Sequence, residues 1–250
     1  MPPDLLAPLH DLPGVADAAT DARQAVDALL THRAMRRRGG DVAVEAGLRC
    51  ARASAALEGA DLPLSELRGR LDDTSLPAAV RGALRLSAEL GGLVETVERA
   101  PLQAFARMHV LAASGPAGED ELGRPRTDDP AVAARLATLA DVLSASTRAP
   151  AVVVAAVVHG ELLALAPFAQ LSGLVARAAG RAVLVSRGLD PRAVSAPDVG
   201  HAEDPSAYAA AAASFASGDV TPWLLHCCAA VRHGAMEGVA ICEALLRATP

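Results

Sequence analysis

Apolar residues recur at intervals of three and four along almost the whole chain. These apolar stripes include Val15, Ala19, Ala22, Val26 and Leu29 near the start, and Val132, Leu136, Leu139 and Leu143 past the middle. This spacing places each set on one face of an α-helix, whereas the alternation that marks a half-buried strand is nearly absent. Alanine, the strongest helix former, is abundant. The sequence therefore predicts a mostly α protein.

Three dipeptides indicate where helices begin. In Asp129-Pro130, Asp204-Pro205 and Thr221-Pro222 a side-chain oxygen stands just before a proline. Such an oxygen can cap the first turn of a helix, where the N–H that proline lacks is not needed. We predict a helix start with a capping side chain at each of these pairs.

The segment from Gly115 to Asp129 interrupts the helical pattern with three glycines, two prolines and many charges. It is too long for a tight connection between helices, so we predict a surface loop or a short β-hairpin. No repeat or low-complexity linker divides the 250 residues, of which 52% are hydrophobic. We expect one compact unit, with an N-terminal helical region over residues 1–100 and a core with C-terminal helices over residues 101–250.

Charge and aromatic content exclude some classes of partner. The net charge is −6 and only 2% of the residues are aromatic, whereas nucleic-acid binding depends on clustered cations and stacking rings. Arg33 and the run from Arg36 to Arg38 form a local cluster that we interpret as a solvated helix end, where cations complement the helix dipole. The longest uncharged stretches fall short of the roughly 18 to 20 apolar residues of a membrane span. We therefore expect neither a nucleic-acid nor a membrane partner.

The first residues lack the basic and apolar regions of a signal peptide, so we expect a cytoplasmic protein. The basic residues are all arginine, a composition typical of a bacterial chain encoded by GC-rich DNA. In the cytoplasm thiols stay reduced. We therefore predict that the four cysteines are free and buried, namely Cys50, Cys227, Cys228 and Cys242.

Residues 151–190 combine an apolar helix bearing His159, a break at Pro167 and a second helix from about Gly173. This arrangement resembles the core of the Fic (Fic/DOC, or Fido) family. In that family a His-Pro-Phe triplet, an acidic residue, a Gly-Asn-Gly-Arg run and a final arginine lie between two such helices. The corresponding residues here are Ala166, Pro167, Phe168, Ala169, Gln170, Leu171, Ser172, Gly173, Leu174, Val175, Ala176 and Arg177. The Pro-Phe pair, one glycine and the last arginine are retained.

A second match lies upstream, where Ser54-Ala55-Ala56-Leu57-Glu58-Gly59 fits the family's inhibitory-helix motif, (S/T)xxxE(G/N), at every defined position. We place the inhibitory-type helix at about residues 41–59. The resemblance implies that Glu58 pairs with Arg177 and, in autoinhibited members, holds that arginine away from the γ-phosphate. We predict a salt bridge between Glu58 and Arg177. A second interpretation is that Glu58 only ends a helix before Gly59.

Further matches follow the family's order over about residues 40–235. His109 and the Gly-Xaa-Xaa-Arg segment Gly123–Arg126 resemble the region of the target-docking flap. The C-terminal matches to a family stretch of Tyr, Gly-Asp and Trp are Tyr208, Gly218-Asp219 and Trp223. The resemblance implies a Fic-like helical bundle, with a short β-hairpin as one form that the flap could take.

The resemblance also implies AMP transfer from ATP to a protein hydroxyl (AMPylation), which requires a base, a divalent cation and a phosphate cradle. Ala166 stands at the base position and has no titratable group. Gln170 replaces the metal-binding carboxylate, and a neutral amide binds Mg²⁺ poorly. Leu171 and Leu174 replace the Gly and Arg that would contact phosphate. We predict no catalytic residue, and a degenerate motif loop that consists of Pro167, Phe168, Gln170, Ser172, Gly173 and Arg177.

The main hypothesis is a pseudoenzyme, a catalytically degenerate Fic-domain protein that binds a partner protein, or a nucleotide such as ATP without transferring it. The alternative is an active Fic-type adenylyltransferase, or another nucleotidyl or phosphoryl transferase, with a non-standard base such as Glu161. A third hypothesis is a helical oligomerisation module. We expect no cofactor, and a homodimer is compatible with every reading.

The cysteines and histidines of the chain are not spaced in the sequence as the ligands of a metal site usually are. His226, Cys227 and Cys228 are consecutive and would point in different directions from one helix, and no Cys-Xaa-Xaa-Cys pair is present. His159 matches a family histidine outside the catalytic loop, and we interpret it as structural. Residues 200–204, Gly-His-Ala-Glu-Asp, read as a polar lead-in to a helix. We therefore predict no metal site.

Overall fold

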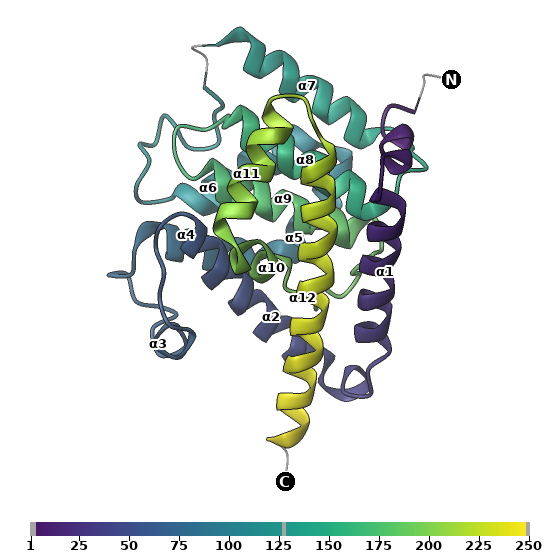
Figure 1. Cartoon of the computed structure of the whole chain (residues 1–250). Coiled ribbons are helices and arrows are strands. Elements are labelled where there is room, and N and C mark those ends of the chain that lie inside the picture. The colour runs from purple at the N-terminus through teal and green to yellow at the C-terminus, as the bar shows by residue number, and fades with distance from the viewer. Residues whose placement is uncertain (1–3, 127–128, 249–250) are drawn as a thin grey trace.

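A computed structural model describes residues 4–126 and 129–248. The described residues are mostly helical, which confirms the predicted fold class (Figure 1). The elements are η1 (Ala7–Asp11), α1 (Val15–Thr31), α2 (Met35–Leu57), α3 (Leu64–Arg68), α4 (Ala78–Ala88), α5 (Leu90–Arg99), α6 (Pro101–Ala113), α7 (Pro130–Ser144), α8 (Ala151–Leu165), α9 (Ser172–Ser186), α10 (Pro197–Glu203), α11 (Pro205–Ala216) and α12 (Thr221–Arg247).

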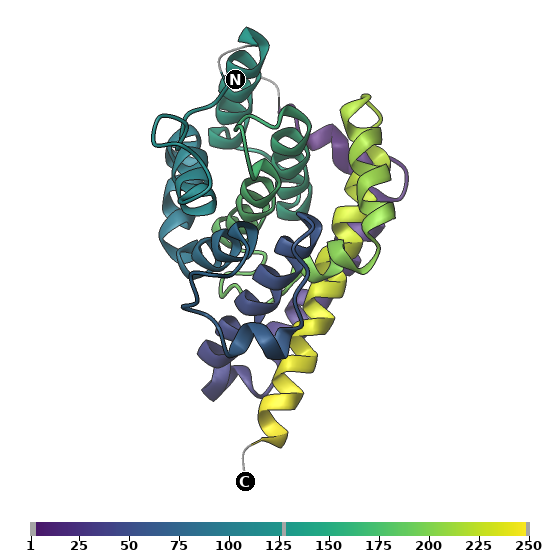
Figure 2. The ribbon, with the colours of Figure 1, turned by 90° about the vertical axis from the view of Figure 1, so that its left-hand side faces the viewer.

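Helices α8 and α9 form a hairpin at the centre of the bundle. Eleven of the 15 residues of α8 are buried, as are 11 of the 15 residues of α9. A helix that is apolar on all sides has to be enclosed by other elements. Helices α5 and α6 pack on α9, while α11 and α12 pack on α8 (Figures 1 and 2). The connection between α8 and α9, which carries the residues that resemble the Fic motif loop, is therefore held between packed helices.

The amphipathic helices α1 and α7 bury the residues that the periodicity indicates. In α1 the buried residues are the predicted stripe from Val15 to Leu29, and in α7 they are the stripe from Val132 to Leu143. Helix α1 packs along α12, the longest helix, whose end extends beyond the rest of the bundle (Figure 1). Helix α2 begins at Met35, earlier than the predicted inhibitory-type helix, and runs to Leu57.

Two of the three predicted helix caps are confirmed. The carboxylate of Asp129 accepts a hydrogen bond from the N–H of Ala131, and Asp204 caps α11 in the same way. The prediction for Thr221 is wrong, because Val220 is the cap and Thr221 is the first helical residue. Asp219 supplies the capping oxygen instead, since its carboxylate accepts from the N–H of Thr221 at 3.3 Å.

The segment after α6 is a loop in the part that the structure describes. An isolated bridge between Ser114 and Ala117 is its only strand-like pairing up to Arg126. The hairpin alternative is therefore not realised there, and Thr127 and Asp128 lie outside the described residues. The arginines at 36–38 lie in the first turn of α2, where Arg36 and Arg37 are exposed. The expectation that they complement the helix dipole is wrong, because the N-terminus of a helix favours anions. No described helix is long and apolar enough to cross a membrane.

Candidate functional site

The connection between α8 and α9 has two residues in the left-handed region, where side chains other than glycine are strained. Ala166 ends α8 with φ 39°, and Leu171 precedes α9 with φ 55°. Such a conformation costs about 1–2 kcal/mol for a residue with a Cβ. Leu171 thus keeps a backbone shape that suits the glycine of the Fic motif, although its side chain differs. Leu171 therefore adopts a backbone conformation that a glycine would adopt without this strain.

The motif loop is held by its buried Pro-Phe pair and by two hydrogen bonds of Ser172. Pro167 and Phe168 are buried, whereas Ala166 and Gln170 are exposed. The hydroxyl of Ser172 accepts a hydrogen bond from the N–H of Phe168 and donates one to the carbonyl of Phe168, each at 3.0 Å. The exposed face of this loop therefore presents an alanine methyl and a neutral amide at the two positions that the resemblance assigns to the base and the metal ligand.

The loop after α6 packs onto the motif loop. The ring of His109 in α6 stacks on Phe168 with ring centroids 4.3 Å apart, and its Nδ1 accepts a hydrogen bond from the N–H of Gly123 at 3.0 Å. The N–H of Arg126 donates to the carbonyl of Pro167 at 2.7 Å. Burial lowers the pKa of His109. The segment that resembles a target-docking flap is thus attached to the loop that it would serve.

Arg177 on α9 is the centre of a buried polar network, and its predicted salt bridge is confirmed. Its Nη2 lies 2.7 Å from Oε1 of Glu58 and donates to the carbonyl of Ser54 at 3.0 Å. Its Nε donates to the hydroxyl of Ser54 at 2.6 Å. The Arg177 side chain is 2% exposed and that of Glu58 22%. The pair joins α2 to α9 across 119 residues of sequence.

The Glu58 carboxylate also covers the start of α9. A Cβ added to Gly173, the second residue of α9, would lie 2.1 Å from Glu58 Oε1. A carboxylate is stabilised there because the N–H groups at a helix N-terminus carry partial positive charge. Glu58 is the C-cap residue of α2, and Gly59 follows it with φ 83°. The interpretation that Glu58 only ends a helix is therefore wrong, because the residue that ends α2 also pairs with Arg177.

Tyr208 on α11 extends this network to His159 on α8. The Tyr208 hydroxyl accepts a hydrogen bond from Nη1 of Arg177 at 3.3 Å and lies 2.9 Å from Nε2 of His159. Burial raises the pKa of Tyr208 to about 12, and burial lowers the pKa of His159 well below its ordinary value. Both groups are therefore neutral near pH 7. His159 has a hydrogen-bond partner, as expected of a structural histidine.

Sequence reasoning missed the buried polar residues of α10. Residues 200–204 read as a polar lead-in, but His201 is 5% exposed and Asp198 is 3% exposed. Asp198 lies 3.7 Å from Arg181, which stands one turn after Arg177 on α9. The two arginines at this spacing in a helix that is otherwise apolar were the available signal, because buried arginines require acidic or polar partners. The four cysteines are buried and free, as predicted.

No family model and no curated protein matches this sequence. Solved structures do match the fold. A Fic family protein from Desulfovibrio desulfuricans G20 superimposes with a TM-score of 0.77 at 19% identity, over 91% of this chain and 74% of that one. A fragment of Fic-1 from C. elegans gives a TM-score of 0.73 at 19% identity, over 95% and 75%.

The chain therefore has the Fic fold, as the sequence resemblance implies. At this level of identity the similarity establishes the architecture, and function has to be argued from the residues of the site.

Proposed function

We propose that this chain is a Fic-fold pseudoenzyme that has lost AMP transfer and acts by binding a partner protein. The loss of transfer is argued from Ala166 and Gln170. The observation that carries binding without nucleotide is the position of Glu58, whose carboxylate covers the N-terminus of α9 and pairs with Arg177 at 2.7 Å. A helix N-terminus of this kind is where a phosphate group would bind. A resident carboxylate competes with an incoming phosphate for the same positive charge.

The chemistry of the loop supports the same proposal. Ala166 offers no proton acceptor, and Gln170 offers a neutral oxygen where Mg²⁺ would need an anionic one. Leu174 is 1% exposed and contributes to the core, so it offers nothing to a ligand. A nucleotide retained without transfer is the second form of this proposal, and it would require Glu58 to leave α9.

The alternative, an active transferase with a displaced base, has two candidate bases near the loop. Glu161 faces α7, where it pairs with Arg135 at 2.7 Å. His109 is fully buried beneath Phe168, and its Nδ1 is already engaged by Gly123. A general base must reach the proton of the attacking hydroxyl. Neither group meets that requirement in this conformation, which favours the pseudoenzyme.

Calorimetric titration with ATP, ADP and GTP, with and without Mg²⁺, tests the proposal on the wild type and on Glu58→Ala. Glu161→Ala is a matched control, because it removes a carboxylate with a similar exposure on another surface. We expect no binding heat from any of the three proteins. Binding that appears only in Glu58→Ala would support the nucleotide-retaining form. Transfer of label from α-labelled ATP to any protein would refute the loss of catalysis.

A further inference from the structure

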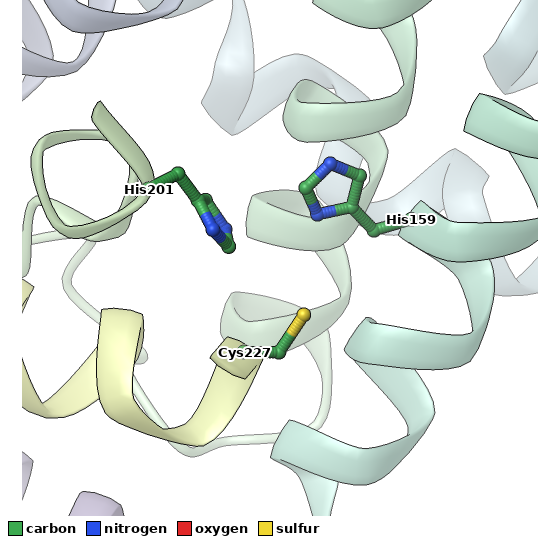
Figure 3. A group of neighbouring side chains, drawn as sticks. All are labelled: His159, His201 and Cys227. Carbon is green, nitrogen blue, oxygen red and sulfur yellow. The ribbon is translucent and has the colours of Figure 1, made fainter. Parts of the chain in front are cut away.

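Three side chains that are separate in sequence meet at the centre of the bundle. His159 comes from α8, His201 from α10 and Cys227 from α12. Each residue offers one possible ligand atom, a ring nitrogen of the two histidines and Sγ of the cysteine. These three atoms all lie within 4.8 Å of one another. Figure 3 shows the two rings and the thiol turned toward one shared space. The three residues border a cavity of about 20 Å³, which is enough for one water-sized species.

We propose that His159, His201 and Cys227 form a site for a divalent cation of the zinc class. Imidazole and thiolate are the ligands that Zn²⁺ prefers, and three protein ligands with one water complete a tetrahedron. Binding replaces the proton of the Cys227 thiol with a metal–sulfur bond and releases that proton to solvent. The ion would join α8, α10 and α12, so its role would be structural.

The outer hydrogen bonds of the two rings suit this role. Nε2 of His159 lies 2.9 Å from the Tyr208 hydroxyl, and Nδ1 of His201 lies 3.1 Å from Nε2 of His226. Metal-binding histidines typically use one ring nitrogen for such a partner, which fixes the tautomer, and the other nitrogen for the metal. Among the described residues no hydrogen bond engages Nδ1 of His159 or Nε2 of His201. Those two nitrogens are the ligands that the proposal assigns.

The electrostatic surroundings can accept the ion. Arg177 and Arg181 also border the cavity, but each faces a carboxylate, with Glu58 at 2.7 Å and Asp198 at 3.7 Å. The cation therefore meets two balanced ion pairs, and the thiolate removes one of its two charges. Burial lowers the pKa of both histidines, which keeps them neutral and able to bind a metal.

Co²⁺ is the probe that tests the site, because a thiolate ligand gives it a charge-transfer absorption. Untagged full-length protein is stripped with a chelator and titrated with Co²⁺. We expect the absorption to saturate at one ion per chain, with about one proton released for each ion bound. The fluorescence of the protein's single tryptophan, Trp223, should be quenched in parallel, because its ring lies 4.8 Å from the His159 ring. Zn²⁺ should displace Co²⁺ and raise the unfolding temperature.

Variants of two adjacent cysteines locate the site. Cys227→Ala should abolish the charge-transfer absorption, whereas Cys228→Ala should retain it, although both thiols are buried on α12. Tyr208→Phe, which removes the outer partner of His159, should weaken Co²⁺ binding by about 10-fold and keep the absorption. Absence of the absorption in the wild type would overturn the proposal, whether or not the variants fold. Loss of the absorption in Cys228→Ala but not in Cys227→Ala would also overturn it.

Discussion

The difference between a buried and an exposed ion pair can be measured with two conservative substitutions. Glu58→Gln and Glu161→Gln each remove one negative charge and keep a side-chain oxygen that can accept a hydrogen bond. Both carboxylates lie 2.7 Å from an arginine, and their exposures are similar, 22% and 24%. The partners differ, because Arg177 is 2% exposed and Arg135 is 52% exposed. A difference in stability therefore reports the burial of Arg177 together with the contact of the Glu58 carboxylate with the start of α9.

We expect Glu58→Gln to lower the free energy of unfolding by about 2 kcal/mol. Hydrogen bonds to charged groups contribute about 1.5–3 kcal/mol, and breaking a fully buried pair costs about 3–5 kcal/mol. The partial exposure of Glu58 places the cost near the lower range, because water can replace part of the lost interaction. Glu161→Gln should cost less than about 1 kcal/mol, since its partner is well solvated.

Equilibrium unfolding in urea and thermal unfolding measure both variants. For a chain of this size about 2 kcal/mol corresponds to a decrease of roughly 4–8 °C in Tm. Added salt should reduce the loss of stability caused by Glu161→Gln. It should leave the loss caused by Glu58→Gln unchanged, because salt screens buried ion pairs less than exposed ones. If both variants lost the same free energy of unfolding, the argument that the buried charge of Arg177 is stabilised by Glu58 would be refuted.

Four further predictions concern pH and backbone conformation. Burial lowers the pKa of His159 and His201. As the pH falls, these two rings therefore take up protons at a higher pH in the unfolded chain than in the folded chain. Stability should be constant above about pH 6.5 and fall below it, by up to about 1.4 kcal/mol per pH unit for each ring, in a metal-free thermal unfolding series. Gly160→Ala, whose Cβ would lie 2.7 Å from the indole nitrogen of the single tryptophan, should cost about 1–3 kcal/mol and change its fluorescence. Gly40→Ala meets nothing within 4 Å and should stabilise by up to about 1 kcal/mol in urea unfolding. Ala166→Gly, at φ 39°, should be neutral or stabilising, and a loss above about 1 kcal/mol would contradict the strain assigned to it.

Local patterns predict much of this fold because each helix buries the face that its spacing defines. The stripe from Val15 to Leu29 and the carboxylates of Asp129 and Asp204 act within one helix, so the sequence alone is enough to place them. The pair of Glu58 and Arg177 is not local, and it was found through a motif resemblance.

The polar residues of α10 show where sequence reasoning ends. Gly200, His201 and their neighbours form a short helix with a polar composition, which locally resembles an exposed turn. Asp198 and His201 are nevertheless buried, because α12 crosses α10 so closely that a Cβ on Gly200 would lie 2.4 Å from the carbonyl oxygen of Ala230. The meeting of His201 with His159 and Cys227 depends on that crossing. No spacing within one segment encodes it.

The network around Arg177 bears on whether removal of Glu58 could restore a working site. Glu58 supplies one of four hydrogen-bond contacts, and the others come from the hydroxyl and carbonyl of Ser54 and from Tyr208. The carbonyl of Ser54 belongs to the backbone of α2, so it stays in place when a side chain is changed. Arg177 would thus remain tied to α2 in Glu58→Ala, while its charge would lose its counter-ion. This arrangement favours a role for Arg177 in docking α2 onto α9 over a role in contacting phosphate, in agreement with the proposed loss of AMP transfer.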